Sequence, residues 1–422
     1  MARRKARLVV VGAGFAGASL IRSLPSALRR PGETLLIDRE DSYPFIPLVH
    51  EVAVGRIHPK SVLSPIPPLC EGRCAFLRSE VRSIDLANRK IETSSGEVGY
   101  EYLALTAGSV AAPPPENLRE SLQSFWSLED ALQLRGTLAD DWWRTLSRDP
   151  DGSEPGALTV AVVGGGATGV ELSAEISALF DYLKKRTHRK LPVEPRVVLL
   201  EATDRLLGWL DPYFQEGAMK ELASLGVEVR LNTAVEEANE GGVQAGEEWL
   251  SAHTRVWAAG VKASPIIESL PVEKDPSGRA EVDEHLTLPG HPEVYLPGDG
   301  GVYTDPRHGP LPPTASVAVQ EGPFVARDLG RRLQGSAGGR RPAFHYFDRG
   351  YIVSLGPESA VAEAVGVRFR GAAAQALYRS IFLYYMKGRR DRVLTGADWA
   401  MERTVGRLGF EKRALPDPAA SL

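Results

Sequence analysis

Two glycine-rich turns carry the most specific chemical signal in this chain. Gly12, Gly14 and Gly17 form the pattern GxGxxG directly after an apolar run, and Asp38 lies 21 residues beyond the last glycine. In a strand-turn-helix unit, such glycines let the backbone approach a pyrophosphate, and the helix amino terminus supplies N–H donors and a partial positive charge. An acid at this spacing accepts hydrogen bonds from an adenosine ribose. These residues predict a dinucleotide site rather than a plain strand-helix corner.

The same pattern occurs a second time. Gly164, Gly166 and Gly169 follow the apolar run LTVAVV, and Glu201 ends the run RVVLLE. Here the acid comes 32 residues after the last glycine, and the intervening basic stretch FDYLKKRTHRKLP predicts a longer helix and loop. An acid at the strand end repels a 2′-phosphate, so NADH is favoured over NADPH, a preference that Arg205 keeps moderate.

Two dinucleotide sites in one chain are typical of flavoenzymes, because a bound flavin needs an exchanging electron donor. We therefore expect FAD in the first site and NADH in the second. Asp299, in the turn YLPGDGG, follows a strand-like run and is placed to bind the ribityl hydroxyls of a flavin. The helix that begins after Pro313, with Thr314 as its cap, would direct its positive end at the flavin ring.

The elements that must position these residues form the βαβ pattern twice, which predicts an α/β fold with two Rossmann-type domains. A length of 422 residues allows two or three domains, and 43% hydrophobic with 25% charged residues excludes wholesale disorder and a multi-span membrane protein. A net charge of -4 gives no reason to expect nucleic acid as a partner. Two cysteines, Cys70 and Cys74, supply neither a disulfide scaffold nor a four-ligand metal site.

The carboxyl-terminal segment differs in charge from the rest of the chain. Residues 366–415 contain 11 basic and 4 acidic side chains. Leu377, Ile381 and Tyr384 recur at helical spacing, and basic residues flank this apolar stripe. Such a helix suits the surface of an anionic membrane, and the alternative is a helix that docks on the protein or on a partner subunit. No uncharged stretch reaches the roughly 20 residues that a spanning helix needs.

The segments GAGFAG, VVGGGATGVEL, VWAAGVKASP, GDGG, ASVAVQEG and FHYFDRGYIVSLG together resemble the type II NADH dehydrogenases. These are single-chain, non-pumping NADH:quinone oxidoreductases within the two-dinucleotide-binding flavoprotein superfamily, and the resemblance covers nearly the whole chain. The glycine motifs are shared by that superfamily, whereas VWAAGVKASP, the helix with Gln320 and the basic carboxyl-terminal helices are more specific.

The resemblance implies that NADH gives a hydride to the flavin, which then passes two electrons to a membrane quinone of a respiratory chain. It places Glu171 near the flavin and nicotinamide, although the plain alternative is a first-turn helix glutamate. On the quinone side the family carries two glutamines four residues apart, and this chain has Ser316 and Gln320 there. A serine reaches less far, so we expect an acceptor site of different shape. Glu175 is expected on a solvated face.

The resemblance further implies a peripheral protein on the cytoplasmic side of the cell membrane, and homodimerisation through the carboxyl-terminal region. His50 has no evident partner in the sequence and is interpreted as structural. We expect an FAD domain at 1–112 and 266–335, an NADH domain at 113–265, and a membrane-association segment at 336–422. Further expected cofactor contacts are Phe15, Ala16, Arg39, Gly108, Gly260, Gly298 and Ala318.

Two other functions fit the same residues. One is an NAD(P)H reductase of a soluble ferredoxin-like acceptor, in which the basic segment would bind an acidic protein instead of lipid. The other is a non-enzymatic flavoprotein that senses redox state. A quinone assay set against a soluble-acceptor assay separates the first, and rapid steady-state turnover excludes the second.

Overall fold

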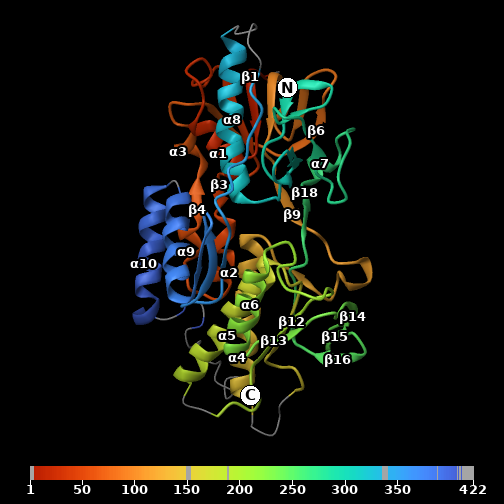
Figure 1. Cartoon of the computed structure of the whole chain (residues 1–422), viewed down its shortest axis with the longest axis vertical. Helices are drawn as coiled ribbons and strands as arrows, with labels where there is room; N and C mark the ends of the chain where they lie inside the picture. Colours follow the sequence, from red (N-terminus) through yellow and green to blue (C-terminus); the bar gives the residue numbers. More distant parts are fainter. Residues whose placement is uncertain are drawn as a thin grey trace, which may run out of the picture. The chain divides into compact units, whose positions relative to one another are not determined.

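The computed structural model describes residues 4–148, 154–187, 190–334, 341–386, 388–405, 407 and 410. Figure 1 labels its helices and strands. The chain forms two compact units, each assembled from three segments. The first unit comprises Met1–Pro44, Ser64–Val110 and Val261–Arg349, and the second comprises Phe45–Leu63, Ala111–Gly260 and Gly350–Leu422.

The first unit is built on an eight-stranded sheet whose central strands are parallel. Along its main path the strand order is β20-β21-β8-β1-β2-β5, and β7 joins β8 to β6. The order reverses between β1 and β8, which pair in parallel, and ligands of such sheets bind at this switch point. The strands are β1 (Arg4–Val11), β2 (Thr34–Asp38), β5 (Ala75–Arg78), β6 (Val81–Asp85), β7 (Lys90–Thr93), β8 (Gly96–Leu105), β20 (Thr287–Leu288) and β21 (His291–Tyr295).

Two helices of the first unit pack directly against each other near this switch point. They are α1 (Phe15–Arg22) and α8 (Ala315–Leu333), which lie side by side (Figure 1). A Cβ at Gly322 would lie 2.4 Å from the carbonyl oxygen of Ala16, so only a glycine allows this approach. The unit also contains α3 (Ile66–Cys70), α7 (Pro265–Glu268), β19 (Ala280–Glu281), β22 (Gly301–Val302), β23 (Thr304–Asp305) and β24 (Gly309–Pro310).

The second unit contains a five-stranded sheet that is parallel throughout. Its strand order is β10-β17-β11-β12-β13, with the reversal between β11 and β17. All five residues of β11 are buried, as expected for a parallel strand covered on both faces. The strands are β10 (Gln123–Ser124), β11 (Thr159–Val163), β12 (Arg196–Leu200), β13 (Glu228–Arg230) and β17 (Thr254–Trp257).

Two small antiparallel sheets and six helices complete the second unit. The sheets are β14 (Val235–Asn239), β15 (Gly242–Ala245) and β16 (Glu248–Ser251), and β25 (Ile352–Ser354), β26 (Ala360–Ala364) and β27 (Val367–Arg370). The helices within its described residues are α2 (Val49–Ala53), α4 (Leu128–Ser147), α5 (Ala167–Arg186), α6 (Pro212–Ser224), α9 (Gly371–Tyr385) and α10 (Arg389–Val405). Short strands near the points where the chain passes between units are β3 (Ser42–Pro44), β4 (Leu63–Pro65), β9 (Ser109–Ala111) and β18 (Val261–Ala263).

The predicted α/β fold with two dinucleotide-binding-like sheets is confirmed. The longer interval of the second motif is also explained, because α5 has 20 residues and α1 has 8. Within the described ranges, no helix is both long and apolar enough to cross a membrane. The bounds of the four predicted segments and the membrane-surface role of the last one stay predictions. The segment GSAGGRR at 335–341 predicts a glycine-rich linker, and all of it except Arg341 lies outside the described residues, as do Lys387 and residues 411–422.

Candidate functional site

The first glycine motif forms a tight turn from β1 into α1. Gly12 has a φ of 100°, and a Cβ there would lie 2.4 Å from the carbonyl oxygen of Thr106. A Cβ at Gly17 would lie 2.1 Å from the carbonyl oxygen of Gly12. At Gly14 no atom of the described residues other than its chain neighbours comes within 4 Å of the position that a Cβ would take, so that side of the turn is open. The turn is therefore closed toward the sheet and open where a phosphate would approach the amino terminus of α1.

Asp38 lies at the end of β2 and holds this turn in place. Its Oδ2 accepts a hydrogen bond from the N–H of Ala13 at 2.8 Å, and its Oδ1 accepts one from the N–H of Glu40 at 3.0 Å. Burial raises the pKa of Asp38 above its ordinary value. Each carboxylate oxygen has a second lone pair, so Asp38 keeps the capacity to accept from a ribose. Arg39, beside it, is exposed.

Asp299 lies beyond the carboxyl end of β21, in the turn that the sequence singled out. Its Oδ2 accepts a hydrogen bond from Ser109 Oγ at 2.6 Å, and burial raises its pKa. Ser109 follows Gly108, which has a φ of 65° and open space at its Cβ position. Gly298, just before Asp299, has a φ of 89°, and a Cβ there would lie 3.1 Å from that of Ala16. Asp299 thus lies beside Ser109, which follows β8, and its neighbour Gly298 lies beside Ala16 at the start of α1.

Two buried ionisable side chains that the sequence did not reveal support the Asp299 turn. The guanidinium of Arg279 donates hydrogen bonds to the carbonyl oxygens of Asp299, Gly301 and Leu311, at 3.2, 2.6 and 3.0 Å. Glu321 on α8 accepts a hydrogen bond from the N–H of Gly298. Burial raises the pKa of Glu321 to about 8, so the carboxyl is neutral at pH 7. The one signal for Glu321 in the sequence is the helical period of α8, which places this residue on the inward face of the helix.

The polar residues predicted for the acceptor side both lie on α8, one turn apart. Ser316 Oγ is 3.4 Å from the hydroxyl of Tyr346. The Gln320 amide donates to the carbonyl oxygen of Phe347 at 3.1 Å and accepts from the Phe347 N–H at the same distance. Gln320 is therefore anchored to the segment around Phe347, which follows α8 in the chain. Ala318, on another face of α8, is buried beside Gly298.

The second glycine motif repeats the geometry of the first. Gly164 has a φ of 114°, and a Cβ there would lie 2.8 Å from the carbonyl oxygen of Ala258. A Cβ at Gly169 would lie 1.9 Å from the carbonyl oxygen of Gly164, whereas Gly166 has open space. Gly260 follows β17 on the other side of this switch point, with a φ of 92°.

Glu201 takes the same role in the second unit that Asp38 takes in the first. Its Oε2 accepts from the N–H of Gly165 at 2.6 Å, and its Oε1 accepts from the N–H of Thr203 at 2.7 Å. Arg205 is paired with Asp204 through two hydrogen bonds of 2.8 and 2.9 Å, and both side chains are exposed. The local positive charge is thus already matched by a neighbouring acid.

Glu171 lies in the first turns of α5, and its side chain is 14% exposed. Its Oε1 accepts a hydrogen bond from the N–H of Ser354 at 3.0 Å. Its Oε2 lies 3.6 Å from Nδ1 of His50. Burial raises the pKa of Glu171 to about 8 and lowers the pKa of His50 to about 3. At pH 7 the pair is therefore a neutral acid facing a neutral imidazole.

One expectation about this region is wrong. Glu175 is not on a solvated face, because it is fully buried and forms an ion pair with Arg56. The helix face that carries it packs against α2, and a periodicity argument cannot show which element covers a face. The sequence identified no partner for His50, and the structure places it in contact with Glu171 and 3.3 Å from the hydroxyl of Tyr378.

Arg56 is the centre of a buried ionic cluster that sequence reasoning missed. Its side chain is 0% exposed and contacts Glu51 and Glu175, as well as Glu402 on α10. Arg407 Nη1 approaches Glu175 at 3.7 Å. Neighbouring carboxylates and the paired cation compensate one another, because an isolated buried charge would be very costly. The cluster ties the carboxyl-terminal helix to α2 and α5.

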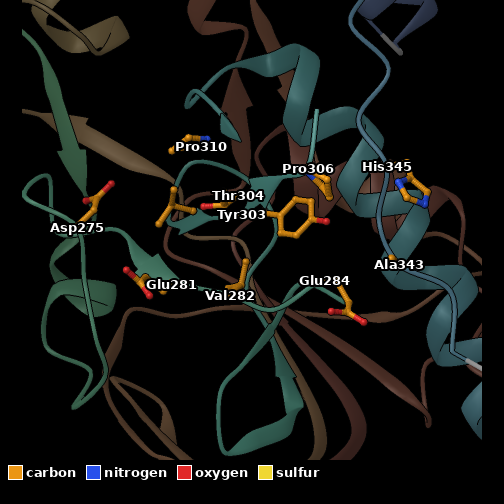
Figure 2. Close-up of a pocket in the computed structure, with 11 residues that line it drawn as sticks. Asp275, Glu281, Val282, Glu284, Tyr303, Thr304, Pro306, Pro310, Ala343 and His345 are labelled. Atoms are coloured by element: carbon orange, nitrogen blue, oxygen red, sulfur yellow. The ribbon is translucent and has the colours of Figure 1, made fainter. Parts of the chain in front are cut away.

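The first unit also contains a pocket of about 720 Å³ that includes none of the predicted site residues. Figure 2 shows the side chains that line it, among them Tyr303, His345 and the acids Asp275, Glu281 and Glu284. Cys70 and Cys74 lie elsewhere in this unit, and both are buried free thiols.

The predicted residues fall into two groups. The first unit holds Gly12, Gly14, Gly17, Asp38, Gly108, Gly298 and Asp299 around one switch point. The second holds the other glycine motif with Glu201 and Gly260. Glu171 belongs to the second unit, whereas Ser316 and Gln320 belong to the first, so their shared reacting centre stays a prediction.

Comparison with known proteins gives a consistent result. The family model of the pyridine nucleotide-disulphide oxidoreductases matches residues 6–322. A type II NADH:quinone oxidoreductase of Mycobacterium tuberculosis is 28% identical over 416 residues, which cover 94% of this chain and 88% of that protein. One of Staphylococcus aureus is 27% identical over 390 residues, covering 90% and 95%. The structure of NDH2 from Plasmodium falciparum in complex with NADH superposes with a TM-score of 0.85 at 17% identity, covering 96% of this chain and 100% of that one.

Proposed function

This chain belongs to the pyridine nucleotide-disulphide oxidoreductase family and, within it, to the type II NADH:quinone oxidoreductases, and we propose from this premise how its residues serve that reaction. It is a flavoprotein enzyme that transfers electrons from NADH to a quinone. One observation carries the residue assignment. Each unit has a glycine turn that is packed shut toward its sheet, open at one glycine, and held by an acid at the end of the next strand.

The first turn is the proposed FAD site. The open side at Gly14 leaves room for a pyrophosphate, and Asp38 keeps lone pairs for the adenosine ribose. Asp299 would accept from ribityl hydroxyls, with Arg279 and Glu321 fixing its turn. Bound FAD would supply the two-electron carrier between NADH and quinone. Phe15, Ala16, Arg39, Gly108, Gly298 and Ala318 are proposed as further contacts.

The second turn is the proposed NADH site. Gly166 is open in the same way, and Glu201 is oriented by two backbone N–H groups. A carboxylate held here would repel a 2′-phosphate. Because Arg205 is engaged with Asp204, it does little to offset that repulsion. We therefore expect NADH to be preferred to NADPH, with Gly260 contributing at the switch point.

Glu171 and the α8 residues are the proposed reacting groups. The overall reaction consumes one solvent proton, because a hydride supplies only one of the two hydrogens of a quinol. Glu171 is suited to hold a proton, since burial keeps its carboxyl neutral at pH 7. Gln320 and Ser316 are proposed to hydrogen-bond the quinone, and Gln320 must then exchange part of its pairing with Phe347.

Membrane contact is proposed for the outer faces of α9 and α10. The inner face of α9 is docked on the protein, since Tyr378 is buried and the ring of Phe382 packs edge-on against Phe45 at 5.6 Å between centroids. The outer faces expose Tyr384 (63%), Val393 (69%) and Met401 (46%). Arg389 and Arg390 are exposed beside them, and cations there would attract anionic lipid. Apolar groups flanked by arginines favour a peripheral membrane contact.

The test of this function is an assay of the purified holoenzyme. The released flavin is identified, and NADH oxidation is measured with a short-chain quinone, with a ferredoxin-like protein, and with NADPH in place of NADH. We expect FAD and rapid turnover only with NADH and quinone. A preparation that rejects added FAD, or that reduces only the soluble protein, would contradict the proposal.

A further inference from the structure

A line of buried polar groups leads from α9 to Glu171 within the second unit. The Tyr378 hydroxyl donates to Glu51 Oε1 at 3.1 Å and lies 3.3 Å from Nε2 of His50. Nδ1 of the same imidazole faces Glu171 Oε2 at 3.6 Å, and Trp399 Nε1 donates to Glu51 Oε2 at 2.7 Å. Glu51, Tyr378 and His50 are all buried. The proposed electron transfer by itself uses none of these three side chains.

The number of hydrogens on each group determines which group donates and which accepts along this line. An indole N–H can only donate, so Trp399 and Tyr378 each use their hydrogen on the Glu51 carboxylate. A phenol has one hydrogen, and therefore the Tyr378 oxygen can only accept from His50. The hydrogen of a neutral His50 must then be on Nε2, which leaves a lone pair on Nδ1.

The remaining side of that imidazole faces Glu171. The Ser354 N–H donates to Oε1, so a proton on Glu171 belongs on Oε2, the oxygen nearest His50. The 3.6 Å between Oε2 and Nδ1 is slightly beyond hydrogen-bond length, so the two atoms must approach by a few tenths of an ångström for the proton to be shared. The acceptor lone pair of His50 thus meets the only hydrogen that Glu171 can carry.

We propose that Glu51, Tyr378 and His50 are positioning residues that hold Glu171 as a neutral acid, with its proton on Oε2. The inference rests on the proposed role of Glu171 and deepens it. It also makes α9, the proposed membrane helix, a part of the site, because Tyr378 determines the tautomer of His50. A change in α9 that displaces Tyr378 would therefore alter proton exchange at Glu171.

The charged surroundings agree with this assignment. Around Glu171 stand His50 and Glu51 of α2, Glu175 one turn along α5, and Tyr378 of α9. Burial is the main cause of the raised pKa of Glu171, and the two other glutamates add to it. Burial lowers the pKa of His50, and Arg56 adds to that effect, so His50 stays uncharged.

The direct test is to determine the tautomer of His50 in the full-length holoenzyme. Nitrogen NMR of protein with labelled histidine distinguishes an Nε2–H from an Nδ1–H imidazole, and His50→Gln identifies its signal among the eight histidines. We expect the neutral Nε2–H form at pH 7, and its loss in Tyr378→Phe. A charged His50, or an Nδ1–H tautomer in the unmodified protein, would overturn the inference. This result does not depend on enzymatic activity, so it stands apart from any failure of the proposed function.

A second test uses the pH profile of kcat/KM for the quinone. Glu171→Gln identifies the limb that belongs to Glu171. In Tyr378→Phe the imidazole is free to donate from Nδ1 to an ionised Glu171, so that limb should move to lower pH by about one unit. The matched control is Tyr100→Phe on β8, which removes another buried hydroxyl, one with no hydrogen-bond partner among the described residues. Equal profiles for the two phenylalanine variants would refute the role of Tyr378.

Discussion

Gly14 and Gly17 belong to one motif, yet the structure predicts different consequences when each becomes alanine. Gly14 has open space and a φ of -63°, so Gly14→Ala should change the free energy of unfolding of the apoprotein by no more than about 0.5 kcal/mol. At Gly17 the new methyl would lie 2.1 Å from the Gly12 oxygen and 2.6 Å from Thr106 Oγ1. Helix α1 must then shift, which should cost roughly 1–3 kcal/mol.

Cofactor binding should separate the two variants in another way. The methyl of Gly14→Ala occupies the space into which a pyrophosphate would fit, and losing one hydrogen bond to a charged group costs about 1.5–3 kcal/mol. FAD should then bind roughly tenfold to a hundredfold more weakly, although the apoprotein folds normally. Gly166→Ala should instead raise the KM for NADH and leave FAD binding unchanged, because it alters only the second turn.

The assay combines the thermal midpoint of the apoprotein with a fluorescence titration of FAD. If Gly14→Ala bound FAD as tightly as the natural protein does, the first glycine turn would not be the flavin site. The same conclusion would follow if Gly166→Ala lost FAD and kept its KM for NADH, since the two turns would then be assigned the wrong way round.

Three more predictions follow from buried or cradle-side charges. Folding raises the pKa of Glu321 from 4.5 to about 8, so the stability that its protonated form contributes is complete below pH 4.5 and is lost as the pH rises through 8. Glu321→Gln should therefore make the thermal midpoint fall less steeply between these pH values. Arg56→Met leaves buried carboxylates unpaired and should lower the free energy of unfolding by roughly 3–5 kcal/mol, whereas the exposed control Arg205→Met should change the thermal midpoint little. Glu201→Gln keeps an acceptor for Gly165 and removes the charge, so the preference for NADH over NADPH in kcat/KM should fall about tenfold; an unchanged ratio would show that Glu201 does not read the ribose.

The sequence predicted the two glycine turns well because their geometry is local. A glycine whose added Cβ would meet a carbonyl oxygen a few residues away is required by the turn itself, as at Gly17 and Gly169. The acids at Asp38 and Glu201 follow from the same βαβ unit, although the hydrogen bonds they accept from Ala13 and Gly165 became visible only in the structure.

Buried polar groups were predicted poorly because their partners come from distant parts of the chain. Arg56 and Glu175 are 119 residues apart, and Glu51 and Trp399 are 348 apart. Helical spacing shows that Glu175 shares a face with Glu171, but it does not show that α2 covers this face. For the same reason Glu321 and Arg279 were missed, although both support the predicted turn at Asp299.

The central claim is that a flavin accepts electrons from NADH and returns them to a quinone. Anaerobic stopped-flow absorbance of the holoenzyme tests it most directly. NADH should bleach the flavin band with loss of NADH absorbance in equal amount, and a short-chain quinone added next should restore the band. A flavin that NADH does not bleach, or a bleached flavin that quinone does not reoxidise, would contradict the account.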